Sequence, residues 1–176
     1  MTIREKAAMM KLDSSKMAST DITVRNAALE KIAESLLAGK ERIFEANAKD
    51  MERAQADNIL PAVIKRLKFS EAKLSDAIAG IHNLIALPDP LFRNQLKRQL
   101  DEGLTLVRET CPIGVIGVIF EARPDALVQI SSLCIKSGNC AILKGGRETT
   151  YTNRILFQII HDSIIDAGLP ADCMLQ

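Results

Sequence analysis

Several classes of protein are excluded by what the sequence lacks. It has no tryptophan and a single tyrosine, and aromatic residues make up 3% of its 176 positions. A stacking platform for single-stranded nucleic acid requires more aromatic side chains than this. Lys and Arg number 23 against 22 Asp and Glu, so there is no bulk positive field to hold nucleic acid or an anionic membrane. We therefore expect neither as a partner.

Metal and membrane signatures are also missing. The four cysteines match no Cys-x-x-Cys zinc or redox spacing, so we expect no metal site. Cys134 and Cys140 are expected to be buried, reduced thiols, which suits the cytoplasm. No apolar run approaches the roughly 20 residues that span a bilayer. Charged residues interrupt positions 1–17, so they do not have the apolar core of a signal peptide.

The first ninety residues have the periodicity of helices. Apolar residues recur at helical spacing over 24–51, after a cap at 19–21 and with an interruption at Gly39. Ser70 predicts the start of another helix, which the Pro-Asp-Pro sequence at 88–90 ends. We expect a helical layer over 1–93 that covers another part of the fold.

The period then shifts toward two. Leu96 and Leu100 precede a turn at 101–103, and Leu104 and Leu106 follow it. This pattern predicts a β-hairpin over 94–110. Because a projecting hairpin has an exposed edge, we expect it to mediate association into a homo-oligomer.

The region 111–176 has a β-α-β-α pattern. A β-branched run at 115–120 predicts a strand buried on both faces. A helix from Pro124, with an apolar face of Leu127, Ile130, Leu133 and Cys134, ends at Gly138. A strand at 140–143, a helix at 148–167 and the start of a third strand at 173–175 follow. We expect an α/β fold with an open, parallel, Rossmann-like sheet that continues beyond Gln176.

Two polar segments follow these strands, at the edge where open parallel sheets bind ligands. In the first, 121–125, Arg123 lies beside a helix N-terminus and can hold a phosphate or carboxylate. The alternative is a surface ion pair between Arg123 and Glu121 or Asp125. In the second, 144–148, Lys144 can donate to ribose or phosphate. Neither common nucleotide-binding fingerprint is present.

Two runs carry a resemblance to a known family. They are CPIGVIGVIFEARP at 111–124 and LCIKSGNCAILKGG at 133–146. Shorter matches occur at 29–33, 46–50, 87–90, 152–153 and 168–170. Together they resemble the gamma-glutamyl phosphate reductases, also called glutamate-5-semialdehyde dehydrogenases, of the aldehyde dehydrogenase superfamily. The resemblance covers nearly the whole chain.

The resemblance implies NADPH-dependent reduction of L-glutamate 5-phosphate to L-glutamate 5-semialdehyde and phosphate, a step of proline biosynthesis. A cysteine thiolate attacks the acyl phosphate in such enzymes, and hydride reduces the resulting thioester. That cysteine is expected beyond Gln176, in a catalytic domain that these residues do not include, so residues 1–176 alone should not turn over substrate. Association with glutamate 5-kinase is a further expectation.

The family also suggests roles for particular residues. The expected cofactor-binding residues are Lys144, Gly145, Gly146, Glu148 and Phe120. Glu148 is one residue further from the lysine than the usual superfamily spacing. Arg123 and Glu121 are expected at the substrate phosphate, with Arg123 in place of the asparagine that general aldehyde dehydrogenases use for the oxyanion. Asp125 replaces an expected asparagine and adds a negative charge there.

Two other functions stay open at this point. One is an aldehyde-oxidising, NAD-dependent enzyme of the same superfamily, although the chain lacks the Pro-Trp-Asn segment of such enzymes. The other is a non-catalytic binding or assembly module. A reading frame that continues past Gln176 into a glycine-rich turn and an Asn-x-x-Cys segment favours an enzyme. A native stop codon there favours the module.

Overall fold

The computed structural model describes residues 2–176. Its helices are α1 (Ile3–Ser19), α2 (Ile22–Ala38), α3 (Lys40–Ala56), α4 (Pro61–Leu67), α5 (Glu71–Ala86), α6 (Pro124–Lys136) and α7 (Thr150–Asp166). Two short 3₁₀ helices are η1 (Arg147–Thr149) and η2 (Ala171–Cys173). The strands are β1 (Asn94–Asp101), β2 (Leu104–Glu109), β3 (Val115–Ile119), β4 (Cys140–Lys144) and β5 (Met174–Leu175).

The helix boundaries follow local capping signals. The Asp21 carboxylate accepts from the Thr23 amide at 2.8 Å and begins α2. Gly39 separates α2 from α3, so the interruption expected there is confirmed. The Ser70 hydroxyl accepts from the Lys73 amide and begins α5, which ends two residues before Pro88. The helical layer predicted for the first ninety residues is therefore present.

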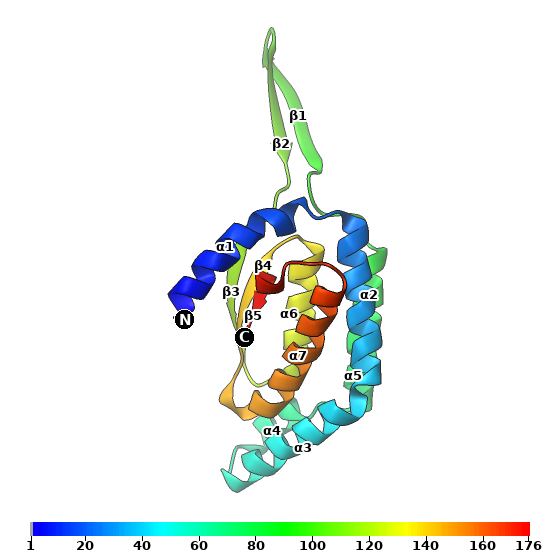
Figure 1. Cartoon of the computed structure of the whole chain (residues 1–176), viewed down its shortest axis with the longest axis vertical. Coiled ribbons are helices and arrows are strands. Elements are labelled where there is room, and N and C mark those ends of the chain that lie inside the picture. The colour runs from blue at the N-terminus through cyan, green and yellow to red at the C-terminus, as the bar shows by residue number, and fades with distance from the viewer. Residues whose placement is uncertain (1) are drawn as a thin grey trace.

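The predicted parallel sheet has the order β3-β4-β5. Val115 lies opposite Cys140 and Ile119 opposite Lys144, while Ala141 lies opposite Met174. Helix α6 packs against β4, α2 packs on α6 and α7, and α5 packs on α2 and α6, while α1 crosses β3 and β4 (Figure 1). The sheet is thus the start of an open α/β layer enclosed by helices.

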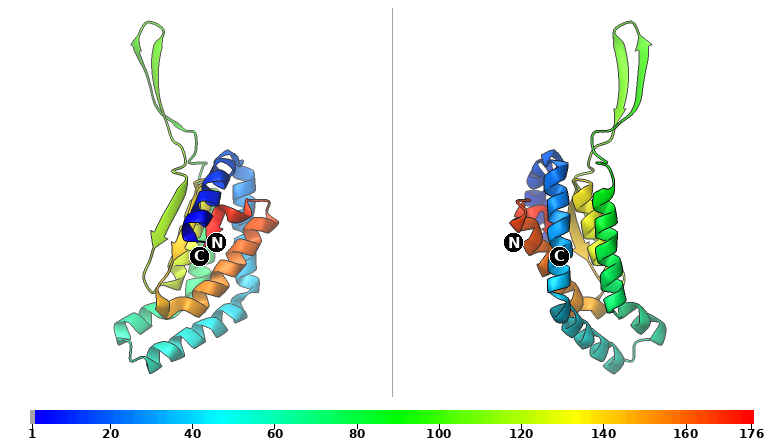
Figure 2. Two further views of the ribbon diagram at one scale, coloured as in Figure 1. Left: turned by 60° about the vertical axis from the view of Figure 1, so that its left-hand side comes forward. Right: turned by 90° about the vertical axis from the view of Figure 1, so that its right-hand side faces the viewer.

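The predicted hairpin is formed by β1 and β2 and projects well clear of the helices (Figures 1 and 2). Gly103 has φ 73° at its turn, a conformation that favours glycine. Every residue of both strands is exposed. These include five large apolar side chains, Leu96, Leu100, Leu104, Leu106 and Val107.

Two expectations about burial and one about a helix boundary are wrong. Strand β3 is not buried on both faces, because Gly117 and Ile119 are exposed and β3 lies at the edge of the described sheet. Leu133 is 56% exposed, because α6 buries Val128 and Ile135 instead. The helix predicted from residue 148 begins at Thr150, after a turn of 3₁₀ helix.

A buried charged network joins the helical layer to α6. The Arg25 side chain is 2% exposed and donates to the backbone oxygens of Thr20 and Lys136 and, at 2.6 Å, to Asp89. The Lys136 ammonium is also buried and donates to Asn26 Oδ1 and to the Ile85 and Leu87 carbonyls. Such partners are what make buried cations tolerable. The network fixes α6 against α2 and the end of α5.

Candidate functional site

The two polar segments singled out from the sequence lie side by side. Strand β3 ends opposite the end of β4, and the Phe120 amide donates to the Lys144 carbonyl at 3.0 Å. This carboxyl edge of the sheet is directed away from the hairpin (Figure 1). The expected meeting of segments 121–125 and 144–148 at one edge is confirmed.

The turn between β4 and α7 opens onto a cavity of about 330 Å³. Its lining residues are Leu143, Lys144, Gly145, Gly146, Thr150, Asn153, Arg154 and Gln176. Neither Lys144 nor Arg154 has an ion-pair partner among residues 2–176. Two free cations beside an exposed glycine turn are suited to an anionic ligand.

Gly145 is required by the protein's own packing, whereas a Cβ on Gly146 would meet most closely the end of the flexible Glu148 side chain. A Cβ on Gly145 would lie 2.2 Å from Asn153 Nδ2 and 3.1 Å from the Phe120 ring. A Cβ on Gly146 would lie 2.6 Å from the Glu148 carboxylate. Phe120 and Glu148 do not line the cavity but pack against the glycines that do. Phe120 and Glu148 therefore act on the shape of the turn and do not themselves face the cavity.

Sequence reasoning missed the side chain that holds α7 in place. Asp50 of α3 is 1% exposed, and its carboxylate accepts from the Tyr151 amide at 3.1 Å, the Thr152 amide at 2.7 Å and the Thr152 hydroxyl at 2.6 Å. The first free amides of α7 are thereby satisfied. A phosphate at this turn would therefore depend on side chains rather than on the helix N-terminus.

The turn between β3 and α6 has its charges paired internally. Arg123 donates to Asp125 at 2.8 Å, and this hydrogen bond, with the charge of Asp125, raises the pKa of Arg123. Glu121 lies 3.6 Å from Arg66, and Lys73 lies 3.9 Å from Asp125. The ion pair that was the alternative interpretation of Arg123 is thus present. The helical layer supplies Arg66 and Lys73, which the sequence did not indicate.

The thiols are not placed for nucleophilic chemistry. Cys134, Cys140 and Cys173 are free and buried. Burial raises the pKa of Cys134, raises that of Cys140 to about 11 and raises that of Cys173 to about 12, so all three stay protonated near neutral pH. Cys111 is exposed but precedes β3, at the end of the strand away from the two turns.

Two kinds of feature are absent from the described residues. No group of three or more His, Cys, Asp or Glu side chains in residues 2–176 is arranged to hold a metal ion. In the same range, no helix combines the length and apolar character needed to cross a bilayer.

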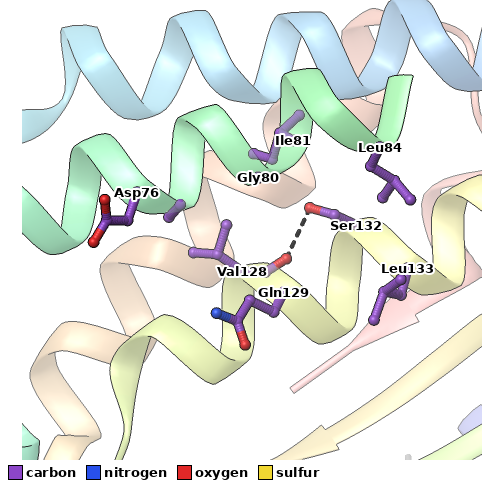
Figure 3. Close-up of a pocket in the computed structure, with 9 residues that line it drawn as sticks. Asp76, Gly80, Ile81, Leu84, Val128, Gln129, Ser132 and Leu133 are labelled. Carbon is purple, nitrogen blue, oxygen red and sulfur yellow. Dashed lines mark hydrogen bonds between the residues drawn. The ribbon is translucent and has the colours of Figure 1, made fainter. Parts of the chain in front are cut away.

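A second hollow, of about 230 Å³, lies between α5 and α6 (Figure 3). Apolar groups from Ile81, Leu84, Val128 and Leu133 make up much of its lining. The Ser132 hydroxyl in it donates to the Val128 carbonyl at 2.8 Å, so this polar group is already paired within α6. No cation lines it, in contrast to the cavity beside Lys144.

Comparison with known proteins identifies what the chain is similar to. No protein-family model matches it. The gamma-glutamyl phosphate reductases of Ruminiclostridium cellulolyticum and Pelotomaculum thermopropionicum are 51% and 52% identical to it over 97% and 98% of its length. The chain is homologous to the N-terminal part of the gamma-glutamyl phosphate reductases. It spans 39% and 40% of the lengths of those two proteins.

Solved structures agree with the sequence match. The gamma-glutamyl phosphate reductase of Saccharomyces cerevisiae superposes with a TM-score of 0.92 at 35% identity, over 97% of this chain and 45% of that one. The Thermotoga maritima reductase gives 0.91 at 28% identity, over 97% and 41%. A methylmalonate-semialdehyde dehydrogenase from Oceanimonas doudoroffii gives 0.70 at 18% identity, over 98% and 32%, which shows the shared fold alone. The resemblance and fold class expected from the sequence are confirmed.

Proposed function

We propose that this chain is the cofactor-binding part of an enzyme that reduces L-glutamate 5-phosphate to L-glutamate 5-semialdehyde, with NADPH as reductant and phosphate as the second product. The observation that carries the proposal is the pairing of two cation-bearing turns at one sheet edge in a chain half identical to gamma-glutamyl phosphate reductases. Open α/β sheets bind their ligands at this edge.

The described residues fit a nicotinamide nucleotide. When bound, NADPH supplies the hydride of the reaction. Lys144 and the Gly145–Gly146 backbone line the cavity that would receive its adenosine ribose, and Asn153, which also lines it, has a buried side-chain oxygen without a partner. Glu148 and Phe120 support the glycines in this proposal. Aldehyde dehydrogenase relatives support a nicotinamide cofactor, and the preference for NADPH is part of the proposal.

The substrate side of the proposal rests on the β3 to α6 turn. Arg123 is 56% exposed at its side chain and can turn from Asp125 toward a dianionic acyl phosphate. Glu121, paired with Arg66, borders the same turn. The nucleophilic cysteine is proposed to lie beyond Gln176, because the buried thiols are held protonated. Replacement of Arg123 by Ala in the active enzyme should strongly raise KM for glutamyl phosphate, and an unchanged KM would contradict this role.

The remaining proposals concern assembly and location. Residues 94–110 would form the oligomerisation hairpin, with 1–93 and 111–176 forming the part of the cofactor-binding domain present here. The exposed apolar side chains of the hairpin support association into a homo-oligomer. The free, buried thiols are consistent with a reducing cytoplasm. Association with glutamate 5-kinase is proposed from the family alone.

The test combines intact mass with activity. The natural protein is purified, its mass is compared with the 19.3 kDa of these residues, and NADPH oxidation is followed with freshly generated glutamyl phosphate. A larger mass with activity supports the proposal. A mass of 19.3 kDa without turnover, but with nucleotide binding, favours the non-catalytic module. Oxidation of aldehydes with NAD and no reaction of glutamyl phosphate favours the sister enzyme.

A further inference from the structure

We infer that Arg154 is the residue that selects NADPH over NADH, by binding the 2′-phosphate of the adenosine ribose. This inference rests on the proposed function, because it names the chemical group that the cavity at the β4 to α7 turn recognises. Arg154 lies on the first turns of α7 and was not among the residues that the sequence indicated.

The first argument is the charge of the cavity. Arg154 and Lys144 both line it, and both lack an ion-pair partner within the described residues. By contrast, the exposed Arg66 and Arg123 at the neighbouring turn are each paired with a carboxylate. Two unpaired cations in one hollow are suited to a dianion such as a phosphate monoester. The Asp50 carboxylate already accepts from the N-terminal amides of α7, so a phosphate in the cavity must be bound by side chains.

The second argument is a buried acceptor in Asn153, a residue that lines the same cavity. The Thr149 hydroxyl donates to the Gly146 carbonyl at 3.3 Å, so it can only accept from Asn153 Nδ2, at 2.9 Å. This fixes the orientation of the Asn153 amide and leaves its Oδ1 without a partner, in a side chain that is 2% exposed. A buried acceptor without a partner, in a residue that lines the cavity, is a place where a ligand can supply a donor.

A ribose with a 2′-phosphate meets both requirements. Its phosphate supplies the dianion for Arg154 and Lys144, and the adjacent 3′-hydroxyl supplies a donor for Asn153 Oδ1. NADH has a hydroxyl at the 2′ position, so it lacks the charged group. The pyrophosphate is common to both cofactors and cannot distinguish between them.

The test measures binding to the natural protein, purified as for the activity test above, by isothermal titration calorimetry with three probes: 2′,5′-ADP, 3′,5′-ADP and 5′-AMP. The first two have the same charge and differ only in the position of one phosphate. The variant is Arg154→Gln, and the control is Arg53→Gln, which removes an exposed arginine of α3 that does not line the cavity. Circular dichroism confirms that each variant is folded.

We expect the wild type and Arg53→Gln to bind 2′,5′-ADP about tenfold or more tightly than 3′,5′-ADP, as one charge-assisted contact provides. Arg154→Gln should lose this preference and keep its affinity for 5′-AMP. An unchanged preference in Arg154→Gln, or an equal weakening of all three probes, would overturn the role of Arg154 while the nucleotide site stands. Failure of the wild type to bind any probe would overturn the nucleotide site itself.

Discussion

The two turns at the carboxyl edge of the sheet differ in whether their cations are paired with carboxylates. Between β3 and α6, Arg123 is paired with Asp125 at 2.8 Å. Between β4 and α7, Lys144 and Arg154 line a cavity without acidic partners in the described residues. A cation that its own neighbour already neutralises must give up that contact to bind a ligand. The second turn is therefore the better prepared anion site, and the first needs a strongly charged ligand to open it.

The largest loss of stability is expected from the variant that removes the side chain holding α7 at the second turn. Asp50→Ala removes three hydrogen bonds from the start of α7 and leaves the Thr152 amide and hydroxyl buried without an acceptor. We expect a loss of about 3 kcal/mol in the free energy of unfolding, from the lost cap and the unpaired groups. Urea denaturation measures it.

The matched control for that variant is Asp57→Ala, an exposed aspartate after α3 that lies 3.8 Å from Arg53. It should change stability by about 0.5 kcal/mol or less. Equal losses in the two variants would show that Asp50 does not anchor α7.

The next largest loss of stability is expected from a substitution at a glycine of the β4 to α7 turn. Gly145→Ala places a Cβ 2.2 Å from Asn153 Nδ2 and 3.1 Å from the Phe120 ring, and Asn153 is buried and has little room to move. We expect a loss of about 2 kcal/mol, as overpacking typically causes, together with weaker nucleotide binding. Gly117→Ala, on β3, has no atom within 4 Å of the new Cβ and should cost little. Thermal unfolding of both variants provides the comparison, which fails if Gly145→Ala is as stable as Gly117→Ala.

A smaller effect on stability is expected from the buried thiols, none of which lies at either turn. Folding raises the pKa of Cys140 from 9.0 to about 11. Below pH 9 the thiol is protonated in both states and stability does not depend on it. Above pH 9 the unfolded chain ionises first, so the free energy of unfolding should fall by about 1 to 2 kcal/mol as the pH rises to 11.

Urea denaturation at pH 8 to 11 measures this slope in the wild type and in Cys140→Ala. The other titrating groups are common to both proteins, so the difference between them isolates the thiol. A variant with the same slope as the wild type would show that Cys140 is not held protonated by burial.

The smallest effect sharpens the contrast between the turns. Asp125→Asn removes the charge that holds Arg123, so the first turn should then resemble the second. We expect inorganic phosphate to bind this turn a few-fold more tightly, since Arg123 no longer exchanges one anion for another. Chemical shifts of the Arg123 side chain during a phosphate titration report it. If they respond identically in the two proteins, Asp125 does not compete with the ligand.

Much of this organisation could be predicted from local patterns. Ser70, Gly39 and Gly138 place helix ends because capping and positive φ are properties of a few adjacent residues. The meeting of the two turns follows from the parallel pairing of β3 and β4. The exposure of Ile119 could not be predicted, because it depends on β3 lying at the edge of the described sheet.

Contacts between residues far apart in the sequence were the other limit on what could be predicted. Asp50 caps a helix 102 residues further along the chain, and the buried Arg25 needs Asp89 and Lys136. No local pattern connects such pairs. Arg154 was within reach, because it is four residues after Thr150 and so shares a helix face with it at the end of the Gly-Gly turn. The sequence leaves open whether Arg123 is free or pairs with Glu121 or Asp125, and the structure shows the pair with Asp125.

A nucleotide is proposed to bind at the β4 to α7 turn and not in the second hollow, the apolar groove between α5 and α6. Hydrogen–deuterium exchange of the chain, with and without saturating NADPH, tests this most directly. The account predicts slower exchange confined to residues 142–155, with the groove segments 76–84 and 128–133 unchanged. Protection of those groove segments, or no protection anywhere, would contradict it.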